Sequence, residues 1–474
     1  MLLSTTPGRA ADSIEGIWQG QSGPSDNQAT LALEIVRSSK GELDARMYID
    51  QIGVYGQAVG MVQRRSRRIY AVPAADMTLT LAKRELQVTG FLRDPKATVT
   101  MVRVFSAPAA PPRPKHPAGS EPQWRIRLGG AIFAPVAAAD GIAYVGNTDG
   151  VMSAVSISDG KRLWSFAAGR PVFGEALVSA GALYFVCDNG YLFRLDRTTG
   201  KETWRYDLGD ARTTRVLPDP YVYDYDYRSP RPVLSGDTLF VGSGDGTFHA
   251  VNASTGARVW HIDGNAAIRS SAVVAGSLLV FSDVAGRVQA VDQSTGRKRW
   301  TFDAKVPATE PALVAGKIIV GARDSMLYAL APDDGHAIWS QYWWGSWVES
   351  TAVGAQGLAY VGSGDLDRVS AIDPATGRNV WRSDVGGWVL QRPLVTDRYI
   401  YVGVSGARRA SPIWLPQASA LMALDRASGR VQWQWSLPDA DGTFLHGFVA
   451  APVEYSGNIL IGGVDGTLYA FAAD

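Results

Sequence analysis

One short segment of this sequence places carboxylates between aromatic rings. Residues 221–228 read Tyr-Val-Tyr-Asp-Tyr-Asp-Tyr-Arg, so Asp224 and Asp226 alternate with Tyr223 and Tyr225. A carboxylate within hydrogen-bond reach of a hydroxyl can accept its proton as a general base. We take Tyr223, Tyr225 and Asp226 as candidate ligand-binding residues, and Asp224 as a candidate catalytic residue through the family resemblance described below.

A second segment is unusually rich in tryptophan. Residues 342–347 read Tyr-Trp-Trp-Gly-Ser-Trp, and another tryptophan stands at the equivalent place further along the chain. Aromatic rings present large apolar faces on which a flat ligand can stack. We therefore predict that four rings contribute to a ligand-binding hollow: Trp343, Trp344, Trp347 and Trp388.

Charged residues recur just before a short apolar strand that is repeated along the chain. The aligned positions are Phe133, Glu175, Arg231, Arg269, Glu310, Glu349, Arg392 and Phe448, with His446 close to the last. Three acids and three bases at one rim could bind a polar ligand, or they could pair with one another and fill the space. We take Glu349 and His446 as further candidate catalytic residues, and Glu175, Arg269, Glu310, Arg392 and Phe448 as candidate ligand-binding residues.

Other kinds of chemistry have little support in the residue spacing. No Cys/His pattern has the spacing of a metal site, so we assign no metal ligands. The Gly-rich stretches are typical of hairpin turns rather than phosphate-binding loops. A single cysteine, Cys187, excludes an internal disulfide and lies in an apolar run that indicates burial.

A repeat with a fixed register must position these residues. A glycine stands four residues before a tryptophan at Gly160, Gly200, Gly256, Gly296, Gly335, Gly377 and Gly429. Turn signals such as Asp245-Gly246 separate runs that alternate with the period of a strand. A period of about 40 residues with four strands per unit predicts radial repetition of β-sheets, as in a β-propeller.

The ends of the repeat array predict how the ring closes. The last unit ends at residues 468–471 without a tryptophan strand, whereas residues 124–128 form a tryptophan strand with no unit before it. Pairing the two completes the last blade and removes the open edges. We predict eight blades of four strands, or seven if one long unit is irregular, with the tryptophans wedged between neighbouring blades.

The candidate residues are expected to share one face of this ring. The Tyr-Asp segment, Trp343 to Trp347, Trp388 and His446 all follow a tryptophan strand and precede the next innermost strand. The inserted segment 405–419 instead replaces a turn within a unit. We expect it to point to the opposite face or outward.

Two further regions precede the propeller. Residues 13–105 contain about seven or eight short alternating runs, which predict a small antiparallel barrel or sandwich. The opening Gly16-Ile17-Trp18-Gln19-Gly20 resembles lipocalin-like domains attached to some secreted hydrolases. Residues 106–122 are rich in Pro and Ala and predict an extended linker, which assigns residues 123–474 to the propeller.

The repeat also resembles a known family. Residues 371–381, Ala-Ile-Asp-Pro-Ala-Thr-Gly-Arg-Asn-Val-Trp, are similar to the PQQ-type propeller repeat. That repeat occurs in quinoprotein dehydrogenases and in the propeller lipoprotein of the outer-membrane β-barrel assembly machinery. Resemblance to the dehydrogenases implies PQQ and Ca²⁺ as cofactors, Asp224 as the base and Glu175 as a cation ligand. This chain departs from them in its single cysteine and its shorter propeller.

Composition narrows the classes of function. The net charge is +1 and charged residues make up 19% of the chain, so no basic stripe indicates a nucleic-acid partner. No apolar run is long enough to span a membrane, and residues 1–11 do not form a complete signal peptide. A periplasmic or secreted location is implied by the family resemblance alone.

Three functions follow from these patterns. The first is binding, with or without conversion, of a small molecule in an aromatic and charged funnel. The second is a non-catalytic scaffold for protein partners. The third is a PQQ- and Ca²⁺-dependent dehydrogenase.

Overall fold

The computed structural model describes residues 13–22, 28–50, 54–90, 98–109, 116–119, 121–209, 228–343, 346–407, 418–437 and 445–473. Residues 13–109 belong to one compact unit and residues 116–473 to a second. Within the described ranges, no helix has the length and apolar character needed to cross a membrane.

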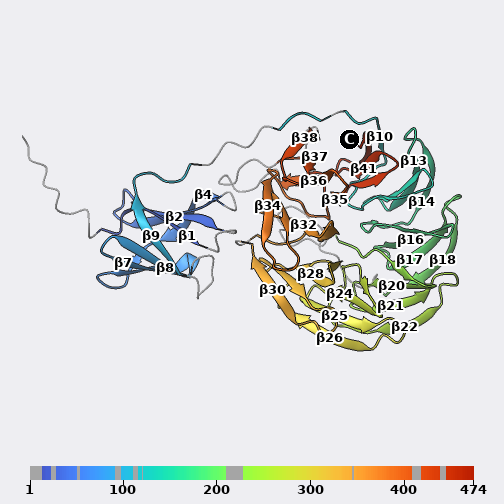
Figure 1. The fold of residues 1–474 in the computed structure, drawn as a ribbon, viewed down its shortest axis with the longest axis horizontal. Coiled ribbons are helices and arrows are strands. Elements are labelled where there is room, and N and C mark those ends of the chain that lie inside the picture. The colour runs from blue at the N-terminus through green and yellow to red at the C-terminus, as the bar shows by residue number, and fades with distance from the viewer. Residues whose placement is uncertain are drawn as a thin grey trace, which may run out of the picture. The chain divides into compact units, whose positions relative to one another are not determined.

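The second unit is an eight-bladed β-propeller whose blades are arranged around one axis (Figure 1). The first four blades each contain four consecutive antiparallel strands. Blade 1 consists of β11 Ala137–Ala139, β12 Ile142–Gly146, β13 Val151–Ser156 and β14 Arg162–Ala167, and blade 2 of β15 Leu177–Ser179, β16 Ala182–Cys187, β17 Tyr191–Asp196 and β18 Glu202–Asp207. Blade 3 consists of β19 Val233–Ser235, β20 Thr238–Gly242, β21 Phe248–Asn252 and β22 Arg258–Ile262, and blade 4 of β23 Val273–Ala275, β24 Leu278–Ser282, β25 Arg287–Asp292 and β26 Lys298–Asp303.

The last four blades complete the ring, and the predicted count of eight is confirmed. Blade 7 carries an additional strand, β39, and blade 8 takes its outer strand, β10, from before blade 1. Blade 5 consists of β27 Ala312–Val314, β28 Lys317–Gly321, β29 Met326–Leu330 and β30 Ala337–Tyr342, and blade 6 of β31 Val353–Ala355, β32 Leu358–Gly362, β33 Arg368–Ile372 and β34 Asn379–Asp384. Blade 7 consists of β35 Leu394–Val395, β36 Tyr399–Ala407, β37 Ala420–Asp425, β38 Val431–Ser436 and β39 Leu445–Gly447, and blade 8 of β40 Val453–Tyr455, β41 Asn458–Gly462, β42 Thr467–Ala472 and β10 Trp124–Arg127.

Burial differs systematically across each blade. The first strands of neighbouring blades touch one another around the axis, as β11 does with β15 and β40. All six residues of β16 are buried, because neighbouring blades pack on both faces of the middle strands. The outer strand β14 alternates between half-buried and exposed residues, since one of its faces meets solvent. The core therefore consists of apolar layers between blades.

Each tryptophan of the repeat lies between its own blade and the next, as predicted. Trp300 on β26 donates its indole N–H to the Pro332 carbonyl of blade 5, with 2.7 Å between donor and acceptor. Its ring lies so close to Gly335 that a Cβ there would come within 2.4 Å of the ring. Gly335 also has φ of +74°, in the left-handed region. The Gly-Trp spacing thus encodes contact between neighbouring blades.

The segment before β10 supplies the glycine that contacts a tryptophan of the neighbouring blade where β10 closes the ring. β10 pairs with β42 in the register Trp124↔Ala470, so the predicted closing strand is confirmed. The Gly119 amide donates to the Gln434 carbonyl at 2.6 Å, and the Gln434 amide donates to the Pro117 carbonyl. A Cβ on Gly119 would lie 2.5 Å from the Trp433 ring. Gly119 therefore takes the place of the turn glycine that blade 8 lacks.

The expectation that the inserted segment after Ser405 points to the opposite face was wrong for residues 405–407, the part of the segment that the structure describes; residues 408–417 lie outside the described residues. Ser405 pairs with Trp388 and also with Gly447 of β39, both of which follow outer strands. The second and fourth strands of an antiparallel blade run in the same direction, so the segments that follow them leave from the same face. β36 therefore continues on the face of the blade-to-blade connections rather than on the opposite one.

The first unit is a nearly closed antiparallel barrel rather than a sandwich. Nine strands form one sheet in the order β4-β3-β2-β1-β9-β8-β7-β6-β5, and β4 approaches β6 and the 3₁₀ turn η2. Their bounds are β1 Gly16–Ser22, β2 Ala29–Arg37, β3 Leu43–Ile49, β4 Val54–Met61, β5 Gln63–Arg64, β6 Ile69–Val72, η2 Pro73–Ala75, β7 Met77–Ala82, β8 Glu85–Thr89 and β9 Thr98–Val104.

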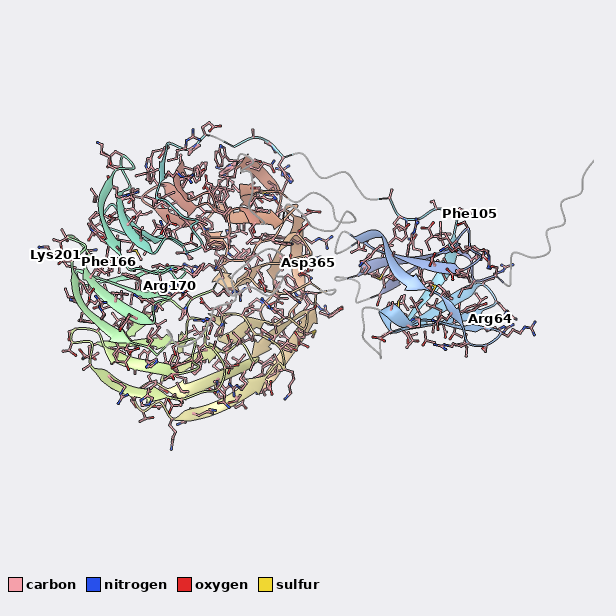
Figure 2. The ribbon with its side chains drawn as sticks, turned by 180° about the vertical axis from the view of Figure 1, so that it is seen from behind. Arg64, Phe105, Phe166, Arg170, Lys201 and Asp365 are labelled. Atoms are coloured by element: carbon pink, nitrogen blue, oxygen red, sulfur yellow. The ribbon has the colours of Figure 1, made fainter. Side chains whose placement is uncertain are left out.

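Large apolar side chains are packed in the barrel core. Trp18, Leu33 and Leu86 are at most 2% exposed, and the Trp18 indole donates to the Ile14 carbonyl. Arg64 and Phe105 lie at the barrel surface with exposed side chains (Figure 2).

A buried histidine between blades 2 and 3 makes propeller stability depend on pH. His249 on β21 is 6% exposed; its Nδ1 lies 3.2 Å from the Tyr206 hydroxyl, and its Nε2 has no partner among the described residues. Burial lowers the pKa of His249 to about 4. Below pH 6.5 the unfolded chain binds a proton that the folded protein does not bind, so this contribution to stability is lost as pH falls from 6.5 toward 4.

We expect His249→Asn to remove that dependence. Between pH 8 and pH 5 the wild type should lose about 2 kcal/mol more unfolding free energy than the variant, because only the wild type carries this histidine. Urea unfolding at the two pH values measures the difference. Equal pH slopes in both proteins would contradict this assignment.

Candidate functional site

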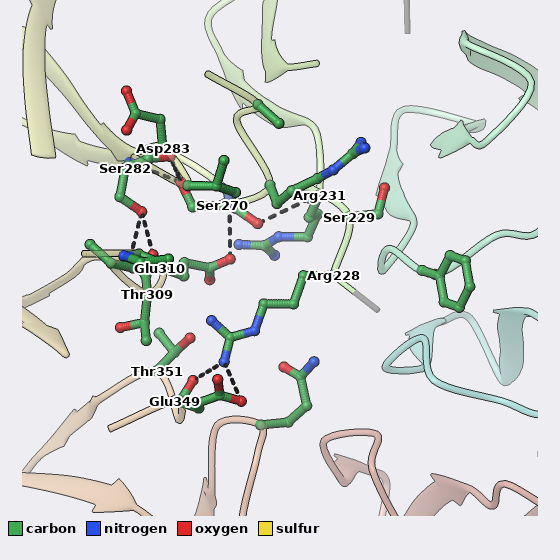
Figure 3. Close-up of a pocket in the computed structure, with 18 of the residues that line it drawn as sticks. Arg228, Ser229, Arg231, Ser270, Ser282, Asp283, Thr309, Glu310, Glu349 and Thr351 are labelled. Carbon is green, nitrogen blue, oxygen red and sulfur yellow. Dashed lines mark hydrogen bonds and ion pairs between the residues drawn. The ribbon is translucent and has the colours of Figure 1, made fainter. Parts of the chain in front are cut away.

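A cavity of about 650 Å³ opens on one face of the propeller, where the blade-to-blade connections leave (Figure 3). Its walls come from segments before the innermost strands of several blades, including residues 228–231, 267–271 and 306–310. The turns between second and third strands contribute as well, through Asp283 and Arg323. The cavity thus combines both kinds of segment that leave this face.

Glu349 is the centre of one charge cluster in the cavity wall. The Arg323 Nε lies 3.0 Å from one Glu349 carboxylate oxygen, and the Arg228 Nη2 lies 3.6 Å from the other. Figure 3 shows the Arg228 side chain extending from blade 3 to Glu349 at the start of blade 6. The Arg323 guanidinium also lies 4.4 Å from the ring centre of Trp347, a cation–π distance. The cluster links two non-adjacent blades.

Glu175 is the centre of a second charge cluster. Its carboxylate is 2.7 Å from the Arg392 Nη2 and 3.8 Å from the Arg231 Nε. Burial lowers the pKa of Arg392, but the carboxylates of Glu175 and Glu310 more than offset this, so that its pKa is raised. Glu175 precedes β15 and Arg392 precedes β35, so this pair also joins non-adjacent blades across the mouth.

Hydroxyl groups form much of the remaining polar wall, and several of them are hydrogen-bonded within the protein. The Ser282 hydroxyl donates to the Thr309 carbonyl at 2.6 Å, while the Ser270 hydroxyl donates to the Ser282 carbonyl at 2.9 Å. Glu310 accepts a hydrogen bond from the Ser271 amide. These contacts hold the segments of blades 4 and 5 in fixed positions around the cavity.

Seven of the residues singled out from the sequence line this cavity. They are Glu175, Arg231, Arg269, Glu310, Trp347, Glu349 and Arg392. Five others lie outside the described residues: Tyr223, Asp224, Tyr225, Asp226 and Trp344. Pairing between the acids and the arginines of the rim, which the sequence left open as the alternative, is also present, but the paired side chains leave the cavity open.

The remaining candidates, Trp343, Trp388, His446 and Phe448, are not among the described residues that line the cavity. Phe448 is fully buried among Trp435 and Tyr469, because its position in blade 7 continues the core between blades 7 and 8. Trp343 is 4% exposed and its indole donates to Gln341. The backbone of Trp388 is paired with Ser405, and His446 lies in β39 opposite Gly406.

Three charged lining residues were absent from the sequence-based candidate set: Arg228, Asp283 and Arg323. Asp283 and Arg323 occupy turns between second and third strands. Only the blade-to-blade connections were expected at this face, so these turns contributed no candidates. Arg228 ends the Tyr-Asp segment, and its position two residues before Pro230 could have suggested a place close to the rim.

Two further ionisable groups of the propeller, neither of them in the lining of the cavity, have raised pKa values. Asp365 is half-buried. Burial raises the pKa of its carboxyl group to about 7, and the nearby carboxylates of Asp367 and Glu349 raise this pKa as well. Burial raises the pKa of the Cys187 thiol to about 11, so Cys187 stays protonated at neutral pH. Cys187 is 1% exposed and packs in the core of blades 1 and 2, as the sequence indicated.

The donor set at the cavity does not fit a quinone–Ca²⁺ pair. Ca²⁺ takes six to eight oxygen ligands, several of them carboxylate oxygens. Of the described lining carboxylates, Glu175 and Glu349 each contact two guanidinium groups, and Asp283 is bonded to Arg287 at 2.6 Å. The described part of the chain contains no group of three or more His, Cys, Asp or Glu residues that could hold a metal.

Eight blades, seven of four strands and one of five, with tryptophan contacts between them define the class of this protein as a closed β-propeller. A family model described as outer membrane protein assembly factor BamB matches residues 116–223, 188–342 and 323–474. The chain belongs to this family of PQQ-like propeller repeats, which confirms the resemblance seen in the sequence.

Individual relatives match only part of the chain. A quinoprotein ethanol dehydrogenase of Pseudomonas aeruginosa is 33% identical over 101 residues, which cover 20% of this chain and 15% of that protein. The outer membrane protein assembly factor BamB of Legionella pneumophila is 29% identical over 115 residues, which cover 24% of this chain and 26% of the relative. The chain therefore matches less than a third of the length of each of these relatives.

Solved structures show the same fold. The quinohemoprotein alcohol dehydrogenase of Comamonas testosteroni aligns with a TM-score of 0.57 and 14% identity, covering 74% of this chain and 76% of that one. Sqt1 of Saccharomyces cerevisiae aligns with a TM-score of 0.57 and 11% identity, covering 74% and 98%. At these identities the likeness concerns architecture alone.

Proposed function

We propose that this protein binds a small polar molecule in the funnel of its propeller. The observation that carries the proposal is the cavity of about 650 Å³, whose wall contains the six charged rim residues and the Trp347 ring. Ligand sites are typically concave, have volumes of this order and combine apolar walls with a few fixed polar groups. The charge clusters and hydroxyl contacts supply fixed polar groups, and Phe173 and Trp347 supply apolar surface.

The contacts favour binding over proton transfer at Glu349. Both of its carboxylate oxygens already face guanidinium groups, so its position supports charge pairing. Asp224 and His446 remain candidate proton acceptors from the sequence. Conversion of the bound molecule is therefore the less supported half of the proposal.

We expect Trp347→Leu to lower ligand occupancy at least about tenfold, because the variant loses the stacking face and releases Arg323. Native mass spectrometry of the protein purified from a bacterial host measures the small molecule retained, and a thermal shift assay with a library of charged and neutral metabolites measures affinity. Leu163→Ala on the exposed outer strand β14 is the control and should change neither. The absence of a retained molecule together with no thermal shift across the library would contradict the proposal.

A scaffold role is the second candidate, and family membership favours it. The matching family model and one of the relatives above bear the name outer membrane protein assembly factor. In this case the partner is a protein, and we propose a periplasmic or secreted location. Substitution of an exposed outer-strand residue, Val380→Asp, should then disrupt a purified complex that Trp347→Leu leaves intact.

The dehydrogenase is the third candidate and conflicts with the donor set described above. Titration of the purified protein with PQQ and Ca²⁺, followed by quinone absorbance, tests it directly. Binding with a spectral change that Asp224→Asn abolishes would restore this candidate over the other two.

A further inference from the structure

One end of the barrel in the first unit carries a cluster of cations. In an antiparallel sheet, alternate hairpins leave from the same end, so residues 65–68 between β5 and β6 share an end with residues 83–84 between β7 and β8. β6 pairs with β7, and the Leu81 amide donates to the Arg68 carbonyl at 2.8 Å, which makes the two hairpins neighbours. We call the six cations of these hairpins and of the adjoining end of β5 the basic cluster: Arg64, Arg65, Arg67, Arg68, Lys83 and Arg84.

The charges of the basic cluster are not compensated within the barrel. All six residues are exposed, and none of them forms an ion pair with a described residue. Arg64 donates its Nε–H to the Ser66 carbonyl at 3.0 Å, which is a neutral acceptor. The described part of this end also holds the ion pair between Arg37 and Glu15, a further cation and three further acids. These last four residues are Lys40, Glu42, Asp44 and Glu85.

Large apolar side chains are exposed at the same end of the barrel. Met61 lies three residues before Arg64, and Ile69 begins β6 directly after the cluster. Val102 pairs with Glu85, the residue that follows Arg84, and Phe105 comes directly after β9. Each of these four apolar residues is at least 41% exposed, and they are the exposed large apolar residues of the described barrel. Exposed apolar surface beside charged groups marks an interaction site more often than a single exposed side chain does.

We propose that this end of the barrel binds the surface of a lipid bilayer that contains anionic lipids. Negative headgroups attract every Lys or Arg close to the surface, and this attraction requires no fixed geometry of the side chains. Exposed apolar side chains can enter the boundary between headgroups and acyl chains, which adds a hydrophobic contribution. A nucleic acid would use the cations but would gain little from Met61 and Ile69, so the apolar residues favour a membrane. The inference is separate from ligand binding in the funnel, because it rests on the barrel alone.

The test is sedimentation of the full-length protein with vesicles of phosphatidylcholine, with and without phosphatidylglycerol. We expect binding to the vesicles that contain phosphatidylglycerol, little binding to phosphatidylcholine alone, and weaker binding as salt screens the charges. Arg65→Gln combined with Arg67→Gln should weaken the binding about tenfold or more, because each cation contributes to the attraction. Arg65→Lys combined with Arg67→Lys should keep it, since the charge is retained.

A matched control removes the same charge elsewhere. Arg297→Gln combined with Arg299→Gln takes two exposed arginines from the propeller, beside and within β26, and should bind vesicles like the wild type. Phe105→Ser removes apolar surface without changing the charge, and should weaken vesicle binding several-fold.

Three results would overturn the inference. The first is equal binding to vesicles with and without phosphatidylglycerol, and the second is wild-type binding by the Arg65→Gln and Arg67→Gln double variant. The third is no binding to either kind of vesicle. If the protein then bound a duplex oligonucleotide instead, the basic cluster would belong to a nucleic-acid site.

Discussion

Gly335→Ala should destabilise the propeller by about 3 kcal/mol. The added Cβ would lie 2.4 Å from the Trp300 ring, which the Pro332 carbonyl holds in place. Overpacking a rigid core site costs about 2 kcal/mol. The residue also has φ of +74°, and an alanine in that conformation costs about 1 kcal/mol more. Chemical denaturation followed by tryptophan fluorescence measures the change in free energy of unfolding.

The same blade provides a matched control. Gly316 has φ of +73°, and a Cβ added to it would have no atom within 4 Å, so Gly316→Ala introduces the backbone strain without the clash. It should cost only about 1 kcal/mol. If the two variants were equally stable, the contact between Trp300 and Gly335 would not determine how blades 4 and 5 pack.

Glu349→Gln is expected to cost about 3 kcal/mol. Glu349 is 7% exposed, and its carboxylate is shared by Arg228 and Arg323 from different blades. Removing one partner of a buried ion pair leaves charge that neither water nor protein compensates well. The glutamine keeps nearly the same shape, so the loss reports charge rather than volume. Thermal and urea unfolding at neutral pH measure it.

Glu202→Gln is the control for that prediction. Glu202 pairs with Arg205 on the outer strand β18, where both side chains are partly exposed to solvent. Surface ion pairs contribute less than about 1 kcal/mol, so this variant should be nearly as stable as the wild type. A similar loss of unfolding free energy in both variants would mean that the charge of Glu349 at the cavity contributes no more to stability than a charge at the surface.

The architecture could be predicted from the sequence because one local sequence motif is repeated. A glycine four residues before a tryptophan marks the turn and the outer strand of a blade, and the unpaired Trp124 strand indicates how the ring closes. The role of Gly119 could not be predicted, because it replaces a turn glycine from a segment remote in sequence. That Gly119 occupies the place of a turn glycine can be recognised only from the structure, which brings residues 117–119 next to Trp433.

The site was only partly predictable. The register of the innermost strands brought Glu175, Glu349 and Arg392 to one cavity, since equivalent positions in a ring of equivalent blades face the same mouth. The register did not indicate Arg323, because this residue follows a second strand rather than preceding an innermost one. Phe448 was assigned to the mouth, but the irregular blade 7 places it in the core. Periodicity therefore predicts equivalent positions well and deviations from the repeat poorly.

The closing strand has a consequence for how the protein is made. β10 leaves the ribosome before any complete blade, yet its hydrogen-bonding partner β42 follows all the other described strands of the propeller. Pairings between distant parts of a chain form slowly, and a strand awaiting its partner offers an open edge to other chains. Until β42 has been made, the nascent ring therefore remains unsealed between its first and last blades.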